Sequence, residues 1–147
     1  MANAASLSRF GEINAEHCEL YRRYRVIRAL LDGRPSRPQR IRSSLSDLAA
    51  LLKSHFAREE ETGYFTDIVE TAPRLGSQVD AVQSEHDHLL QRLEKLDERI
   101  AISNELVTNY EAIRRDIGEF LDACHEHETR ENRLVQDAYL VDIGTGD

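Results

Sequence analysis

The sequence has 147 residues, enough for one compact domain, and 40% of them are hydrophobic, which suffices for a single buried core. Its net charge of −8 argues against nucleic acid or an anionic membrane as a partner, because both attract basic surfaces. It shows no secretory leader and no membrane-length apolar run, and two cysteines, Cys18 and Cys124, are too few for a disulfide framework, so we expect a cytoplasmic protein.

Four segments carry apolar residues at alternating spacings of three and four, the pattern of amphipathic helices that pack in a bundle. In chain order they cover residues 10–31, 41–62, 79–100 and 106–134. Gly33, Pro35 and Pro38 end the first segment, and Gly63 ends the second. The stretch 63–76 reads as irregular, with at most a short helical turn.

Short connections between the first two and the last two helices favour antiparallel neighbours. We therefore predict an all-α fold, an up-down-up-down antiparallel four-helix bundle. We expect one domain over residues 1–147, with its core at about 7–134 and a C-terminal tail at 135–147.

Polar side chains occupy six positions on the four apolar stripes, where no lysine or arginine falls. They are His17, His55, Glu59, His86, His127 and Glu131. Burying carboxylates is costly unless a counter-charge compensates them, and metal cations supply one. Imidazole suits iron, zinc and copper, and carboxylates can bridge two ions. In an antiparallel bundle all six lie at one level, roughly 10–12 Å from one end, which predicts a two-metal site.

The chain also carries an internal repeat. Glu16-His17 with Leu20 recurs as Glu85-His86 with Leu89, and His55-x-x-Arg58-Glu59 recurs as His127-x-x-Arg130-Glu131. Each half thus supplies one lone histidine and one His-x-x-x-Glu pair, whose spacing places both side chains on one helix face. Two equivalent halves favour a pair of metal ions, with the two glutamates as candidate bridges.

Other polar residues near this pattern are expected to be conventional. His88 and His125 lie roughly 200° around their helices from the stripe histidines and should face solvent or a neighbouring residue. A solvated acidic face is the simplest reading of Glu60, Glu61, Glu126 and Glu128, although Glu85 or Glu126 could accept a hydrogen bond from a ligand imidazole. Cys124 reads as a small core residue, and the sequence does not select which tyrosine lies near the metals.

At these residues the chain resembles the hemerythrin-like proteins, the family of HHE cation-binding domains, over residues 10–134. The features that carry the resemblance are the lone first histidine, His55-Phe56-x-x-Glu59-Glu60, Glu85-His86-x-x-Leu89 and the final histidine–carboxylate pair. The resemblance implies a non-haem di-iron centre: two iron ions with histidine terminal ligands, bridging carboxylates and a bridging oxo, hydroxo or water. It also implies reactivity toward oxygen or a small anionic ligand.

Two departures from the oxygen-carrying members matter. Those members have a second histidine where this chain has Leu90, and they end with histidine and aspartate five residues apart, where Asn132 stands. The chain is therefore similar to the subgroup with two His-x-x-x-Glu pairs, some members of which are linked to oxygen, iron or peroxide sensing. A missing nitrogen ligand implies a more open coordination position.

The leading functional prediction is a non-enzymatic di-iron protein that binds or senses oxygen, a related small ligand or iron. A di-iron peroxidase or oxidase is the main alternative, and a zinc or mixed-metal bundle is another, because metal supply as well as ligands decides selectivity. A plain interaction bundle leaves the buried glutamates unexplained. The sequence identifies no protein partner.

Overall fold

The computed structural model describes residues 4–33 and 38–144, in which all regular structure is helical. Its elements are α1 (Ala4–Leu31), α2 (Pro38–Glu61), α3 (Tyr64–Thr71), the 3-10 turn η1 (Pro73–Leu75), α4 (Gly76–Ala101), α5 (Glu105–Thr108) and α6 (Tyr110–Gly144). Pro35 and positions 145–147 of the predicted tail lie outside the described residues. The prediction of an all-helical bundle is confirmed. None of the described helices is both long and apolar enough to cross a membrane.

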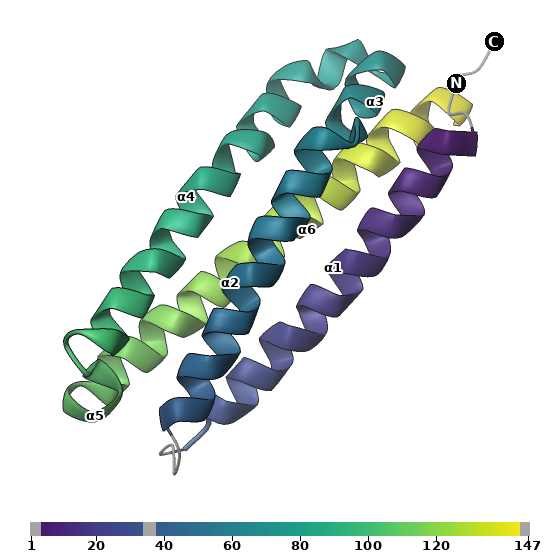
Figure 1. Ribbon diagram of the computed structural model, residues 1–147. Coiled ribbons are helices and arrows are strands. Elements are labelled where there is room, and N and C mark those ends of the chain that lie inside the picture. The colour runs from purple at the N-terminus through teal and green to yellow at the C-terminus, as the bar shows by residue number, and fades with distance from the viewer. Residues whose placement is uncertain (1–3, 34–37, 145–147) are drawn as a thin grey trace.

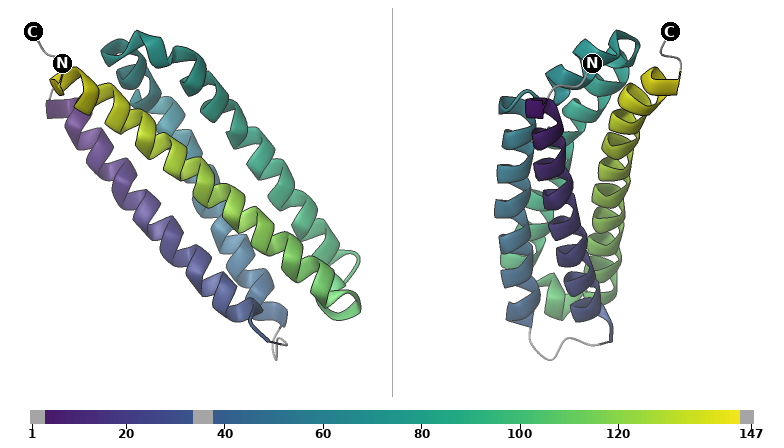
Figure 2. Two further views of the ribbon diagram at one scale, coloured as in Figure 1. Left: turned by 180° about the vertical axis from the view of Figure 1, so that it is seen from behind. Right: turned by 90° about the vertical axis from the view of Figure 1, so that its right-hand side faces the viewer.

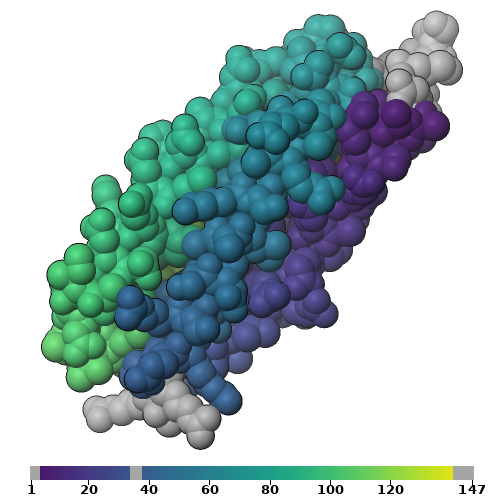
Figure 3. Space-filling model, in the orientation of Figure 1, coloured from purple at the N-terminus to yellow at the C-terminus, as the bar shows by residue number. Residues whose placement is uncertain are grey.

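The four long helices α1, α2, α4 and α6 lie side by side. Successive long helices run in alternating directions (Figure 1). α2 packs between α1 and α4 on one face, as the space-filling view shows (Figure 3), and α6 packs between the same two helices behind (Figure 2). Each long helix therefore turns one stripe of side chains toward a common axis, where polar groups on different helices can meet.

Two apolar clusters fill the interior. The larger begins at Leu20, Phe56, Leu89 and Cys124 and extends toward the α5 end of the bundle. The smaller contains Ile13, Val82 and Leu134, and α3 and η1 contribute aromatic and aliphatic side chains to it. On α1, α4 and α6 the predicted site residues fall between the members of these two clusters. The structure thus contains a polar layer between two apolar cores.

Two helix boundaries differ from the sequence prediction. The last helix does not stop at Leu134; it continues to Gly144, because the buried Ala138 and the partly buried Tyr139 pack on α3 in the smaller cluster. The stretch 63–76 is also more regular than predicted, since Gly63, at φ 87°, allows the chain to turn directly from α2 into α3. Because α1 begins at Ala4, His17 lies about 20 Å from the start of its helix, deeper than expected.

The fourth predicted helix is in two parts. α5 ends at Thr108, and Asn109 has an extended φ of −151° before α6 begins at Tyr110. Leu106 of α5 is still buried in the larger cluster. The apolar periodicity therefore continues across a break in the backbone, which explains why the sequence read as one helix.

Candidate metal centre

All four long helices contribute to one buried polar layer. α1 supplies His17, α2 supplies His55 and Glu59, α4 supplies His86, and α6 supplies His127 and Glu131. None of these six residues is more than 2% exposed. The stripe positions place them there, since each occurs where an apolar core residue would otherwise stand. The structure therefore brings together every residue of the predicted site; we call them the six-residue cluster.

The cluster divides into two overlapping groups of four possible metal ligands. One group is His17, His55, Glu59 and Glu131, and the other is Glu59, His86, His127 and Glu131. Within each group the ligand atoms all lie within 4.8 Å of one another. Each group has two imidazoles of its own, and the two carboxylates belong to both groups.

The two oxygens of Glu131 face different histidine pairs. Its Oε1 lies 2.7 Å from His127 Nε2 and 3.3 Å from His86 Nε2, whereas Oε2 lies 3.1 Å from His17 Nε2. A carboxylate in this orientation can contact a cation in each group.

Glu59 spans the same two groups from the opposite helix. Its Oε1 lies 3.1 Å from His55 Nε2 and 3.5 Å from His86 Nε2, and its Oε2 lies 3.7 Å from His17 Nε2. Both carboxylates therefore have the placement of bridges.

The hydrogen bonds within the described residues leave much of this cluster unsatisfied. Buried atoms without a hydrogen-bond partner include Nε2 of His17, His55 and His127, both oxygens of Glu59 and Oε2 of Glu131. Buried polar atoms are normally hydrogen-bonded, so such a concentration indicates that they are arranged for another partner. Imidazole nitrogens and carboxylate oxygens are suitable ligands for iron and zinc, and the donor set fits such cations.

The outward nitrogens of the histidines face hydrogen-bond acceptors. The Nδ1 of His17 donates to Asn132 Oδ1 at 3.0 Å. The Nδ1 of His55 donates to Glu16 at 3.3 Å, and that of His86 donates to Glu60 at 3.2 Å. Since these oxygens can only accept, Nδ1 carries the proton, and in a neutral ring Nε2 keeps a lone pair directed into the cluster.

The internal repeat has a structural counterpart in these outer contacts. Glu16 lies beside His55 Nδ1, and Glu85 takes the same position 3.5 Å from His127 Nδ1. Each glutamate is in turn paired with an arginine of the His-x-x-Arg-Glu segment, Glu16 with Arg58 and Glu85 with Arg130. Glu85 thus lies where an acceptor for a ligand imidazole was expected, although His127 Nδ1 makes no hydrogen bond to it at this distance, whereas Glu126 is exposed.

Without a metal ion, protons bound to the cluster residues are the positive charge that balances the two buried carboxylates. Burial lowers the pKa of His17, but the nearby carboxylates of Glu131 and Glu59 outweigh burial and raise its pKa to about 10. Burial and the neighbouring positive charge of His17 lower the pKa of His55 to about 4.

The two central carboxylates titrate in opposite directions. Burial and the adjacent Glu131 raise the pKa of Glu59 well above its usual value. Burial also disfavours the charge of Glu131, but contacts with Glu59 and with the surrounding imidazoles hold the pKa of Glu131 well below its usual value. The cluster thus retains both protons and negative charge, and a metal cation would compete with those protons.

Aromatic side chains cover the cluster on the α4 side. The Phe56 ring stacks on the His86 imidazole, with centroids 4.0 Å apart and planes 6° apart, and Phe65 lies 5.7 Å from the same imidazole. These contacts fix the ring orientation of His86 and keep water from it. The resemblance implied a more open coordination position at the metal. All six cluster residues are nevertheless buried, so no such opening to solvent is seen at them.

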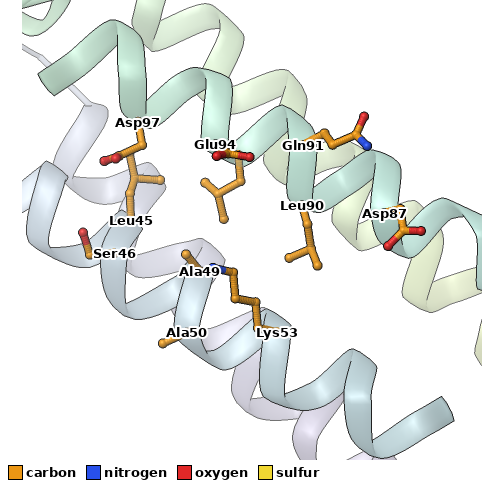
Figure 4. Close-up of a pocket in the computed structure, with 11 residues that line it drawn as sticks. Leu45, Ser46, Ala49, Ala50, Lys53, Asp87, Leu90, Gln91, Glu94 and Asp97 are labelled. Atoms are coloured by element: carbon orange, nitrogen blue, oxygen red, sulfur yellow. The ribbon is translucent and has the colours of Figure 1, made fainter. Parts of the chain in front are cut away.

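Leu90, one turn beyond His86, lines a surface groove. This groove between α2 and α4 has a volume of about 600 Å³, and Leu90 points from α4 into the space between the two helices (Figure 4). Acidic side chains, including Asp87, Glu94 and Asp97, surround it. None of the six cluster residues lines it.

One prediction about a neighbouring residue needs correction. Glu128 is not on a solvated face: it is fully buried and accepts a hydrogen bond from the Tyr24 hydroxyl at 2.7 Å. Burial is the main reason that the pKa of Glu128 is raised to about 8. Glu60 is exposed but contacts His86, as described above. His88 and His125 are exposed, as predicted, and His125 packs edge-on against Tyr21 at 4.8 Å.

Comparison with known proteins gives one match. The family model of the hemerythrin HHE cation binding domain matches residues 10–139. No curated protein and no solved structure matches the chain at a significant level. The matched range includes all six residues of the cluster.

Proposed function

The chain belongs to the hemerythrin HHE cation-binding domain family, and on that premise we propose that it is a non-haem di-iron protein that binds or senses oxygen, a related small ligand or iron itself. The observation that carries this proposal is the pair of four-residue groups that share Glu59 and Glu131. A single-metal site needs no second group of ligands, and a structural ion pair needs no shared carboxylate between two histidine pairs.

In this proposal each group holds one iron ion. His17 and His55 would hold one ion, His86 and His127 would hold the other, and the two glutamates, which belong to both groups, would serve both ions. The bound iron pair supplies one-electron redox chemistry and positions for a small ligand. The Nδ1 contacts of the histidines orient their Nε2 lone pairs toward the cluster. Glu59 and Glu131 balance the charge of the ions, and the aromatic side chains exclude water.

Burial favours small ligands. Because no cluster residue is more than 2% exposed, a ligand reaches the centre only through fluctuations of the side chains around it. Oxygen and small anions such as azide fit this restriction better than an organic substrate does. This argument favours binding or sensing over an oxidase that acts on larger molecules.

The remaining expectations about the whole chain form part of the same proposal. The alternating helix directions in Figure 1 support the up-down-up-down topology. We propose one domain over residues 1–147, which acts in the cytoplasm without nucleic acid or membrane as a partner; α6 as far as Gly144 forms part of it.

Absorption spectroscopy of iron-loaded protein tests the function. Ferrous protein is exposed to oxygen and then returned to inert gas or vacuum. We expect a lasting ferric charge-transfer spectrum that changes when azide is added, because four protein ligands per ion include two carboxylates, which favour the ferric state. Glu131→Gln serves as the variant with a damaged bridge.

The other outcomes each identify a different function. Clean return of the ferrous spectrum without reductant would identify a reversible carrier. Repeated turnover of added peroxide would identify a peroxidase. A colourless protein that retains zinc and rejects iron would contradict the di-iron proposal.

A further inference from the structure

A third acidic side chain lies buried beside the six-residue cluster. Glu128 follows His127 on α6 and is fully buried. Its Oε1 accepts the hydrogen bond from Tyr24, while its Oε2 is also buried and has no hydrogen-bond partner among the described residues. Natural proteins rarely leave a buried carboxylate oxygen in this state.

Helix geometry places this carboxylate next to the cluster. Glu128 precedes Glu131 by three residues, so the two side chains lie on neighbouring turns of α6. Its hydrogen-bond donor, Tyr24, is on α1, two turns beyond His17. Glu128 directly follows His127 on α6, so the bonded pair of Glu128 and Tyr24 joins two helices that both carry cluster residues.

No ion pair among the described residues balances the charge of Glu128. The described residues form no ion pair with it, and its one close polar contact is the neutral Tyr24 hydroxyl. A buried carboxylate with one neutral donor is unfavourable, and it becomes favourable when cations lie nearby.

The charges of the centre supply the missing compensation. Two divalent cations bound by neutral imidazoles and by Glu59 and Glu131 leave an excess of positive charge in a buried layer. A further negative charge reduces that excess without using a ligand position.

We propose that Glu128 is a third carboxylate of the metal centre, a charge-compensating residue that strengthens cation binding and that Tyr24 holds in position. The inference rests on the proposed function only in requiring bound cations, since it does not depend on their being iron. Glu128 lies outside the two His-x-x-x-Glu pairs, so the motif alone does not assign it this role.

The competing explanation is a purely structural hydrogen bond between α1 and α6. These explanations differ in what Glu128→Gln should do. Glutamine keeps an oxygen that can accept from Tyr24, so a structural role is largely preserved, but the negative charge is lost. Glu126→Gln is the matched control, because Glu126 is an exposed glutamate two residues earlier on the same helix.

The experiment measures the affinity for Zn²⁺, and for Fe²⁺ without oxygen, together with melting temperatures of metal-free and loaded protein. We expect Glu128→Gln to weaken cation binding by about tenfold, within the range for supporting residues around metal ligands. Its metal-free melting temperature should be equal to or above that of the wild type, because an uncompensated carboxylate is gone. Glu126→Gln should change neither quantity, and Tyr24→Phe should weaken binding less than Glu128→Gln does.

Unchanged cation affinity in Glu128→Gln would overturn the inference, as would equal falls in the metal-free and loaded melting temperatures. Failure of the wild-type chain to bind either cation would contradict the proposed function itself and the inference with it. Normal wild-type binding with an unaffected Glu128→Gln variant would contradict the inference alone.

Discussion

Each buried histidine of the cluster separates the roles of its two ring nitrogens. Nε2 points toward carboxylate oxygens at 2.7–3.7 Å. Nδ1 hydrogen-bonds a side-chain oxygen in His17, His55 and His86, and in His127 it lies 3.5 Å from Glu85 without a hydrogen bond. This division is typical of metal-binding histidines, because the outer acceptor fixes the tautomer and the ring orientation. A histidine buried only for packing has no need of two acceptors on opposite sides.

The bridging glutamates should matter most for metal content. We expect Glu59→Ala and Glu131→Ala each to lower bound metal from two ions to one or none, because each carboxylate belongs to both groups. Metal per chain, measured by plasma emission spectroscopy after loading and desalting, checks this. His88→Ala and His125→Ala are the controls, since both residues are exposed and lie outside the cluster. Loss of metal in His125→Ala would show that the wrong face of α6 has been assigned.

The sequence predicted the six cluster residues because each replaces an apolar residue at a regular stripe position. It did not predict Glu128, which is about 100° around α6 from His127 and off the narrow stripe. The buried face of α6 is wider there because Tyr24 of α1 packs against it, and stripe width depends on neighbours that a sequence does not show. The sequence marks Asn132 only as a departure from the family pattern, although its contact with His17 gives it a supporting position.

At the scale of elements, the two halves of the bundle build equivalent supports. α1 and α2 form one half, in which Glu16 contacts both His55 and Arg58; α4 and α6 form the other, with Glu85 between His127 and Arg130. Each lone histidine contacts a residue of the other half: His17 of α1 contacts Asn132 of α6, and His86 of α4 contacts Glu60 of α2. The repeat in the sequence therefore corresponds to an approximate two-fold arrangement around the cluster.

This equivalence gives a paired prediction. Glu16→Gln and Glu85→Gln should each weaken metal binding by about 10- to 100-fold, the range for residues that orient metal-bound histidines. Isothermal titration with Zn²⁺ measures both. Glu12→Gln is the control, because Glu12 pairs with Arg58 at 3.3 Å but forms no ion pair with a histidine of the described residues. Wild-type affinity in both variants would mean that these contacts are surface ion pairs without influence on the site.

A second element-scale prediction concerns the end of the bundle far from the cluster. Arg99 of α4 donates to Glu105 of α5 and Asp116 of α6, and these contacts lower the pKa of both carboxyl groups. A carboxyl group with a depressed folded pKa stabilises the protein above its unfolded pKa, and this stabilisation is lost as the pH falls through the folded value. Arg99→Met should therefore lower the melting temperature at pH 7, and the difference from wild type should shrink below about pH 4. A difference that is constant with pH would indicate lost packing instead of lost ion pairs.

The four long helices could be predicted from the sequence, but the residues at which they begin and end were harder to predict. The four long periodic segments correspond to α1, α2, α4 and the α5–α6 region. The break at Asn109 leaves no trace in the apolar pattern, because Leu106 and Ile113 are buried on either side of it. The extension of α6 beyond Leu134 depends on α3, whose packing surface is formed only when the chain folds.

At the scale of the whole molecule, the polar layer interrupts an otherwise continuous core. It separates the two apolar clusters and contains charged groups that neither cluster can solvate. Cations that bind only the folded chain link metal affinity to stability. The bundle is expected to be most stable when the layer is metal-loaded.

Removal of metal should therefore lower the melting temperature. At a free cation concentration 100-fold above the dissociation constant, binding adds about 2.7 kcal/mol, which corresponds to a shift of roughly 5–10 °C in a domain of this size. Calorimetry before chelation, after chelation and after restoring ferrous iron measures the shift and its reversal. Identical melting curves in all three samples would count against coupling between the layer and the fold.

The central claim is that two cations share Glu59 and Glu131 between two histidine pairs. Anomalous X-ray diffraction from crystals of iron-loaded protein, collected on both sides of the iron absorption edge, tests it most directly. We predict two iron peaks about 3–4 Å apart, the separation of two-metal sites, one beside His17 and His55 and the other beside His86 and His127. A single peak, or peaks away from both glutamates, would contradict the claim.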